Sequence, residues 1–119
     1  MQENTKDIKE ILGNKINSVK YRLAFYRKYG FTEEAKKDEH WYVRFEAYRV
    51  LGYTEEAKQD EDDRVRHGAY QELGFTEESL LDEHWKIRLK AYRALGFTEE
   101  ALQDKHGRIR HEAEIWFSI

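Results

Sequence analysis

Apolar residues recur with helical spacing in a stretch of eleven residues, and the same pattern returns along the chain. At about 100° per residue, the stretch from Trp41 to Leu51 places its apolar side chains on one arc, which predicts the buried face of a helix. That arc consists of Trp41, Val43, Ala47, Tyr48 and Leu51. A charged residue, Arg44, falls in its centre, so this helix needs a partner for a buried guanidinium.

The pattern is an internal repeat of 22 residues without insertions, marked by five arginines: Arg22, Arg44, Arg66, Arg88 and Arg110. Within one unit, Gly52 predicts the end of a long helix, because glycine adopts the left-handed C′ conformation without steric cost. Thr54 predicts the N-cap of a short second helix, and Glu55 and Glu56 place negative charge at its start. The other units carry the same glycine and threonine signals: Gly30 and Thr32, Gly74 and Thr76, and Gly96 and Thr98.

Repeats of this size cannot bury an apolar face alone and do so by stacking on their neighbours. The sequence therefore predicts an all-α protein, a right-handed α-solenoid of about five short helix pairs. We expect one repeat domain over residues 1–119: an N-terminal cap (1–21), four repeats (22–109) and a C-terminal cap helix (110–119).

Composition limits the function classes. Of the 119 residues, 38% are charged and 39% are apolar, and there is no cysteine, so disulfides and thiolate zinc sites are excluded. No apolar run approaches the ~20 residues of a membrane span, and the first residues lack a signal-peptide apolar region. These features predict a cytoplasmic protein.

The buried arginines need anionic partners, and one acid recurs with them. An aspartate stands six residues before each of four arginines: Asp38 before Arg44, Asp60 before Arg66, Asp82 before Arg88, and Asp104 before Arg110. Contacts along one helix join residues three or four apart, so residues six apart do not easily meet there. We therefore expect each aspartate to pair with an arginine of an adjacent layer. Arg22 or Arg110, depending on the direction of pairing, should then lack its aspartate. The alternative is that the arginines form a clamp for a ligand.

The spacing Asp-x-x-x-x-Val/Ile-Arg resembles the signature of HEAT repeats, and the short unit is also similar to leucine-rich-repeat-variant solenoids. The resemblance implies a ladder of aspartate–arginine pairs between repeats. It also implies a stack of helix pairs in which the second helices line a concave face.

Two positions of the long helix point away from the predicted core and hold seven cations and no acid among nine residues. We define the basic face by seven of these residues: Arg27, Tyr42, Arg49, Arg64, Lys86, Arg93 and Arg108. Because acids concentrate on the short helices, the net charge of −3 conceals opposed stripes. The simpler alternative is an ordinary charged surface, in which Glu46 neutralises Arg49 and Glu112 neutralises Arg108.

The interpretation we favour is a non-enzymatic binding or scaffold module whose concave basic face engages an acidic protein. The second interpretation is a nucleic-acid-binding module, since the HEAT resemblance includes DNA glycosylases that hold DNA on such a face. The acidic rims and the lack of a groove-reading or base-stacking motif disfavour nucleic acid.

Clusters that could carry chemistry have simpler explanations. In the Asp-Glu-His stretches at Asp38 and Asp82, the Asp and Glu residues are interpreted as helix-capping and helix-dipole residues. The acidic run from Asp60 lacks the glycine and terminal glutamate of a calcium loop. We therefore predict no catalytic residue, metal or cofactor. Trp41 and Trp85 are interpreted as core residues rather than as a ligand cage.

The last unit departs from the repeat. Glu114 replaces the tyrosine of the other units, and Ile115, Trp116 and Phe117 replace the Arg-x-Leu segment that precedes glycine. This patch is predicted to be covered by a partner or by a second copy in a homodimer; the alternative is that it folds back on its neighbour.

Overall fold

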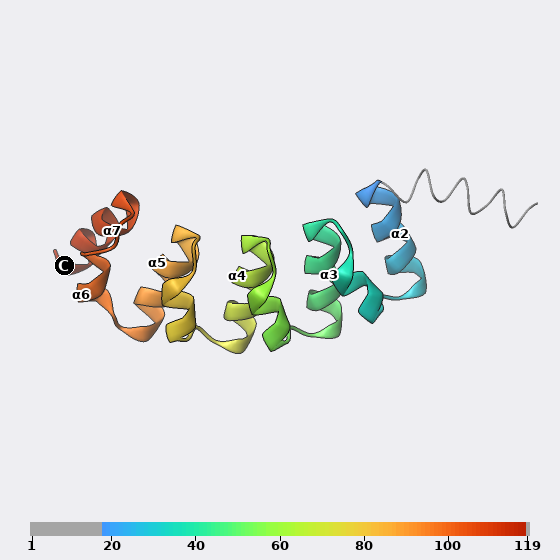
Figure 1. The fold of residues 1–119 in the computed structure, drawn as a ribbon, viewed down its shortest axis with the longest axis horizontal. Coiled ribbons are helices and arrows are strands. Elements are labelled where there is room, and N and C mark those ends of the chain that lie inside the picture. Colours follow the sequence, from blue (N-terminus) through green and yellow to red (C-terminus); the bar gives the residue numbers. More distant parts are fainter. Residues whose placement is uncertain (1–17, 119) are drawn as a thin grey trace, which may run out of the picture. The chain divides into compact units, whose positions relative to one another are not determined.

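The computed structural model describes residues 18–118, and every element of regular structure within that range is a helix. The chain divides into two compact units, one ending at Thr54 and the other beginning at Glu55. Figure 1 shows long helices alternating with short helical turns in each unit. The predicted N-terminal cap falls mostly outside the described residues.

Unit 1 contains two long helices and the turn between them. Helix α2 spans Val19–Tyr29, the 3-10 turn η1 spans Glu33–Lys37, and α3 spans Trp41–Leu51. Its core cluster comprises Leu23, Ala35, Val43 and Ala47, so each of the three elements contributes to it.

Unit 2 contains the remaining elements in alternating order (Figure 1). They are η2 (Glu55–Gln59), α4 (Asp63–Leu73), η3 (Glu77–Leu81), α5 (Trp85–Leu95), α6 (Thr98–Ala101) and α7 (Gly107–Phe117). Buried alanines recur on every long helix of this unit, as at Ala69, Ala91 and Ala113, where the small side chain permits close packing. No helix in the described part of the chain combines the length and apolarity that crossing a membrane requires.

The predicted buried arc of α3 is mostly correct. Val43 and Ala47 are fully buried, and Arg44 is 7% exposed in the middle of the arc. Leu51 is the exception, with 42% of its surface exposed, because it is the last residue of α3 and the core cluster ends one turn earlier at Ala47. Trp41 is half-buried, as expected of a residue at the edge of a core. Trp85 packs against the core cluster of α6 and α7, which consists of Ala101, Ile109 and Ala113.

The predicted glycine stops are present, but their conformations differ. Gly96 adopts the left-handed conformation (φ 78°, ψ 16°), and the following N–H of Phe97 donates to the Tyr92 carbonyl at 2.9 Å, as in a Schellman motif. Gly52 instead combines φ 106° with ψ 137°, while its own N–H donates to the Tyr48 carbonyl at 2.7 Å. Both positive φ values favour glycine over any residue with a Cβ.

The helix starts differ from the prediction in detail. Three long helices are capped by histidine: Nδ1 of His40, His84 and His106 accepts the backbone N–H two residues later, at 3.1–3.2 Å. In α4 the side chain of Asp62 takes this place. Thr32 is the N-cap of η1 as predicted, although its side chain makes no capping bond, whereas the predicted cap at Thr98 is wrong, because Thr98 is the first residue of α6 and Phe97 is its N-cap. The turn at Thr32 is closed by its backbone carbonyl, which accepts the Ala35 N–H.

Candidate functional site: a basic pocket on α4 and α5

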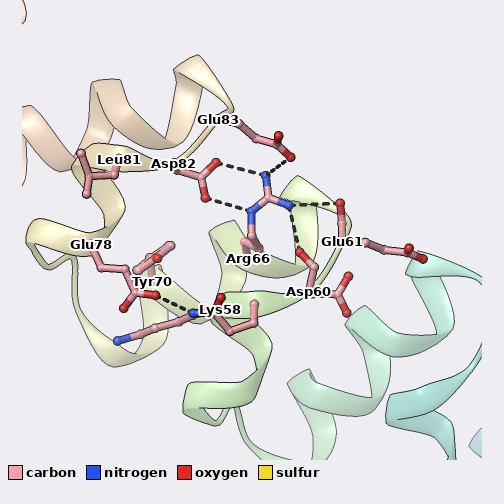
Figure 2. A pocket seen from close by; sticks show the side chains of 10 residues that line it. Lys58, Asp60, Glu61, Arg66, Tyr70, Glu78, Leu81, Asp82 and Glu83 are labelled. Carbon is pink, nitrogen blue, oxygen red and sulfur yellow. Dashed lines mark hydrogen bonds and ion pairs between the residues drawn. The ribbon is translucent and has the colours of Figure 1, made fainter.

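The buried arginines are held by a repeated set of bonds, shown for Arg66 in Figure 2. Nε and Nη2 of Arg66 donate to the two carboxylate oxygens of Asp82 at 2.8 and 3.1 Å. Nη1 donates to the backbone carbonyls of Asp60 and Glu61 at 2.9 and 3.1 Å. Every nitrogen of this guanidinium is therefore occupied by the protein itself.

The same arrangement recurs in both units. In unit 1, Nε and Nη2 of Arg22 donate to the Asp38 carboxylate at 2.8 and 3.0 Å. In unit 2, Nε and Nη2 of Arg88 donate to the Asp104 carboxylate, both at 3.0 Å. Each of these aspartates also accepts the backbone N–H of the histidine two residues later. The contacts predicted for Asp38, Asp82 and Asp104 with an arginine of the adjoining repeat are thus present. Each carboxylate fastens one long helix to the start of the next.

Two arginines need separate comment. Arg44 belongs to unit 1 and Asp60 to unit 2, so their pairing stays a prediction. Within unit 1, Nη1 of Arg44 donates to the Asp38 carbonyl at 2.8 Å. Arg110 is exposed, and its Nη1 donates to the Asp104 carbonyl at 2.7 Å, with no carboxylate partner among residues 18–118. Because Arg22, Arg66 and Arg88 each pair with the aspartate sixteen residues later, this direction of pairing leaves Arg110 without a ladder aspartate.

The environment of Asp104 strengthens its pair with Arg88. Burial alone would raise the pKa of Asp104, but hydrogen bonds from Arg88, from the His106 N–H and from the Tyr92 hydroxyl lower it to about 2. The Tyr92 hydroxyl donates to Asp104 Oδ2 at 2.8 Å, and burial together with this bond raises the pKa of Tyr92 to about 12. Both oxygens of Asp104 are engaged within the protein by Arg88 and Tyr92, which favours a structural role for the ladder over the clamp.

A cavity of about 430 Å³ lies beside the Arg66–Asp82 pair (Figure 2). Five carboxylates line it: Asp60, Glu61, Glu78, Asp82 and Glu83. Its two cations are already engaged, Arg66 by Asp82 and Lys58 by Glu55 at 3.0 Å and by the ring of Tyr70, 5.4 Å from the ring centroid. This cavity does not suit an acidic partner.

The basic face is exposed at every cation but not at its aromatic residue. Tyr42 is half-buried, packs against the core of unit 1 and stacks on Phe45, and its role in binding a partner stays a prediction. The ring is large enough to reach back from the helix surface to the core.

Four of the six cations of the basic face have an acid beside them. Arg27 and Arg49 approach the same carboxylate, Glu46, at 3.7 and 2.6 Å, and Glu46 is only 5% exposed. Arg64 pairs with Asp62 at 2.9 Å, and Arg108 lies 3.6 Å from Glu112. For these residues the simpler interpretation of a locally neutralised surface holds.

The two remaining cations contact aromatic rings instead. Lys86 Nζ lies 5.6 Å from the ring centroid of Trp85, and the Arg93 guanidinium lies 5.3 Å from that of Trp116. Neither has a carboxylate within ion-pair distance in residues 18–118. Their charge is available to an anion from outside.

Lys86 lies in a pocket of about 550 Å³ formed within unit 2 by α4 and α5. We define the basic pocket by its lining. Three cations contribute: Arg64, Lys86 and Lys90. Three rings contribute: His67, His84 and Trp85. Asp63, Ile87 and Leu89 complete it. A pocket of this size and mixed lining is within the usual range for ligand and side-chain recognition.

Lys90 was missed by the sequence analysis, and it is exposed and unpaired within the described range. The repeat itself carried the signal. The equivalent position, 22 residues apart, holds Glu46 in α3, Gly68 in α4, Lys90 in α5 and Glu112 in α7. The acid that neutralises the face of α3 is therefore absent from both helices of the basic pocket.

Two histidines of the pocket are held in fixed arrangements. His84 accepts the Lys86 N–H through Nδ1, so its Nε2 carries the proton and faces Asp63 Oδ2 at 3.5 Å. His67 has a buried Nε2 without a hydrogen-bond partner within the described structure. Burial, followed by the charge of Lys90, lowers the pKa of His67, so it is neutral at physiological pH.

No three histidine, aspartate or glutamate side chains gather as a metal site among residues 18–118. At the C-terminal end, Ile115 and Phe117 are 43% and 51% exposed, whereas Trp116 is half-buried against the core of α6 and α7. Trp116 thus folds back on its own unit, and self-association through the exposed pair stays a prediction.

Comparison with family models, with curated proteins and with solved structures finds no match to this chain.

Proposed function

We propose that this chain is a non-enzymatic binding module, a right-handed α-solenoid of HEAT-like repeats, that engages an acidic protein through the basic face of its long helices. The observation that carries the proposal is the pair Lys86 and Lys90. These lysines stand one helical turn apart on α5, are exposed, and contact no carboxylate in the described part of the chain.

The contrast with the rest of the surface supports this choice. Acids compensate Arg27, Arg49, Arg64 and Arg108, and the cavity beside Arg66 is predominantly acidic. Complementary charge steers association and suppresses wrong partners, so the uncompensated region is the best place for an acidic partner. An acidic protein remains favoured over a nucleic acid, because the carboxylates on the short helices would repel a long polyanion.

The test uses two fluorescent probes, a poly-glutamate peptide and a DNA duplex, each titrated with the whole chain and followed by anisotropy. We expect the peptide to bind at physiological salt and the double variant Lys86→Glu/Lys90→Glu to weaken it at least about tenfold. The control is Lys37→Glu/Lys105→Glu, which makes the same charge change at two exposed lysines outside the pocket.

Each other outcome contradicts the proposal. Equal losses in the two double variants would mean that only net charge matters. Tighter binding of DNA than of peptide, with a steep dependence on salt, would establish the nucleic-acid module instead.

A further inference from the structure

The basic pocket has apolar surface between its cations, which charge complementarity alone does not use. Leu89 and Trp85 are half-buried and supply this surface, whereas Ile87, also in the lining, is only 1% exposed. Lys86 and Lys90 stand on the same helix as these residues, so cations and apolar surface alternate within about two turns.

The sequence of α4 has neither a side chain nor a charge at one repeat position. Gly68 is a buried glycine in the middle of a helix, where glycine is less favourable than alanine because of its backbone entropy. It stands at the repeat position that Glu46 occupies in α3. Neither helix of the pocket therefore supplies a carboxylate at this position to compete for the two lysines.

We infer that the basic pocket recognises an acidic segment of a partner protein that carries an apolar side chain between its carboxylates. The apolar side chain enters between α4 and α5 against Leu89 and Trp85, and flanking carboxylates pair with Lys86 and Lys90. This inference rests on the proposed function and specifies the recognition element of the same site.

Charge and geometry limit the occupant. Lys86 and Lys90 are four residues apart, so their ammonium groups can meet two carboxylates of one short segment. One wall carries Asp63, which already faces His84, and a uniformly acidic segment would place a carboxylate against it. An apolar residue between the acids avoids that repulsion and buries apolar surface.

The experiment compares two synthetic peptides with the sequence Glu-Glu-Asp-X-Glu-Asp-Glu, in which X is leucine or glutamine. Their charge is the same, so any difference in affinity reports the apolar contact. We expect the leucine peptide to bind the whole chain about tenfold more tightly, which is a typical gain for burying such a side chain.

The location is checked by methyl NMR on the same titrations. The leucine peptide should shift the Leu89 methyl resonances, whereas the glutamine peptide should shift them little. Leu23 in the core of unit 1 is the matched control and should not move with either peptide. This readout needs no substitution in the protein, so misfolding cannot imitate the result.

The results of these titrations distinguish failure of the apolar contact from failure of acidic-partner binding. If both peptides bind equally and Leu89 does not respond, the apolar contact is wrong while the acidic-partner proposal stands. If neither peptide binds, both are wrong. If the leucine peptide binds but shifts resonances elsewhere than the pocket, the inference is overturned.

Discussion

The long helix α3 of unit 1 and the helices α4 and α5 of unit 2 have closely related sequences but differ in the charges left unpaired on their surfaces. In unit 1, Glu46 is buried beneath Arg27 and Arg49 and neutralises them. In unit 2 the equivalent positions hold Gly68 and Lys90, and a pocket with unpaired lysines results. One repeat position thus separates a neutralised face from one that can attract an anion.

The interior of the two units does not differ in this way. A bidentate arginine–aspartate pair is present in both units, Arg22 with Asp38 and Arg66 with Asp82, and the shorter hydrogen bond is 2.8 Å in each. The ladder therefore supplies a common scaffold, while the outward positions are free to vary. This separation is why function must be sought in the differences between repeats.

The largest expected effect concerns the common interior. Asp82→Ala leaves the Arg66 guanidinium buried without its carboxylate and should destabilise the protein by about 3–5 kcal/mol. Asp38→Ala should lower the free energy of unfolding by a similar amount, because Arg22 and Asp38 form the same kind of pair in unit 1. Urea unfolding measures both, with Asp63→Ala, a half-exposed aspartate, as the control. A loss below about 1 kcal/mol for Asp82→Ala would contradict the structural role and favour the ligand clamp.

The second-largest expected effect is the loss of folding stability at low pH when Asp104 is protonated. The folded-state pKa of Asp104 is lowered from 3.8 to about 2, so its ionised form contributes stability that is fully present well above pH 4. That contribution, about 2 kcal/mol, should be lost as the pH falls from about 4 towards 2. Unfolding curves across this range should show the loss in wild type and a smaller pH dependence in Asp104→Asn. Equal pH dependence in the two proteins would show that other carboxylates are responsible.

The pairing of the buried arginines was predictable from the sequence because few residues could serve as their partners. An arginine inside an apolar arc must be paired, and Asp38, Asp82 and Asp104 belong to the one set of acids that recurs with the arginines. The helix ends followed from Gly52 and its equivalents for a similar reason, since few residues tolerate positive φ.

The surface was less predictable, because a helical wheel gives each side chain a direction but no neighbours. It placed Arg27 and Arg49 correctly in solvent, yet whether Glu46 reaches both depends on contacts between helices. It also missed Lys90, whose significance appears only when the pocket of α4 and α5 is known. Histidine caps were missed because Ser, Thr, Asp and Asn are the usual N-cap residues.

Exchanging the residues that distinguish the two faces tests the comparison directly. Lys90→Glu gives α5 the acid of α3 and should weaken the acidic peptide about tenfold, since attraction becomes repulsion. Glu46→Lys removes the carboxylate shared by Arg27 and Arg49 and should give unit 1 an affinity for the same peptide. Stability should change little in the first variant, because Lys90 is exposed. If Lys90→Glu binds as well as wild type, the difference between the faces is not functional.

The smallest effect concerns how the helices of the two units begin. His40 caps α3 through Nδ1, whereas Asp62 caps α4 through a carboxylate oxygen. His40→Ala removes the acceptor of the Tyr42 N–H and should cost about 1 kcal/mol, while His40→Asp restores an acceptor of the kind that α4 already uses. Thermal and urea unfolding of both variants separate capping from the ring contact of His40 with Trp41, whose centroids are 6.0 Å apart. Recovery of stability in His40→Asp would establish capping as the role of the imidazole, and the two cap types would then be interchangeable between the units. Equal loss in both variants would assign the stabilisation to the ring contact instead.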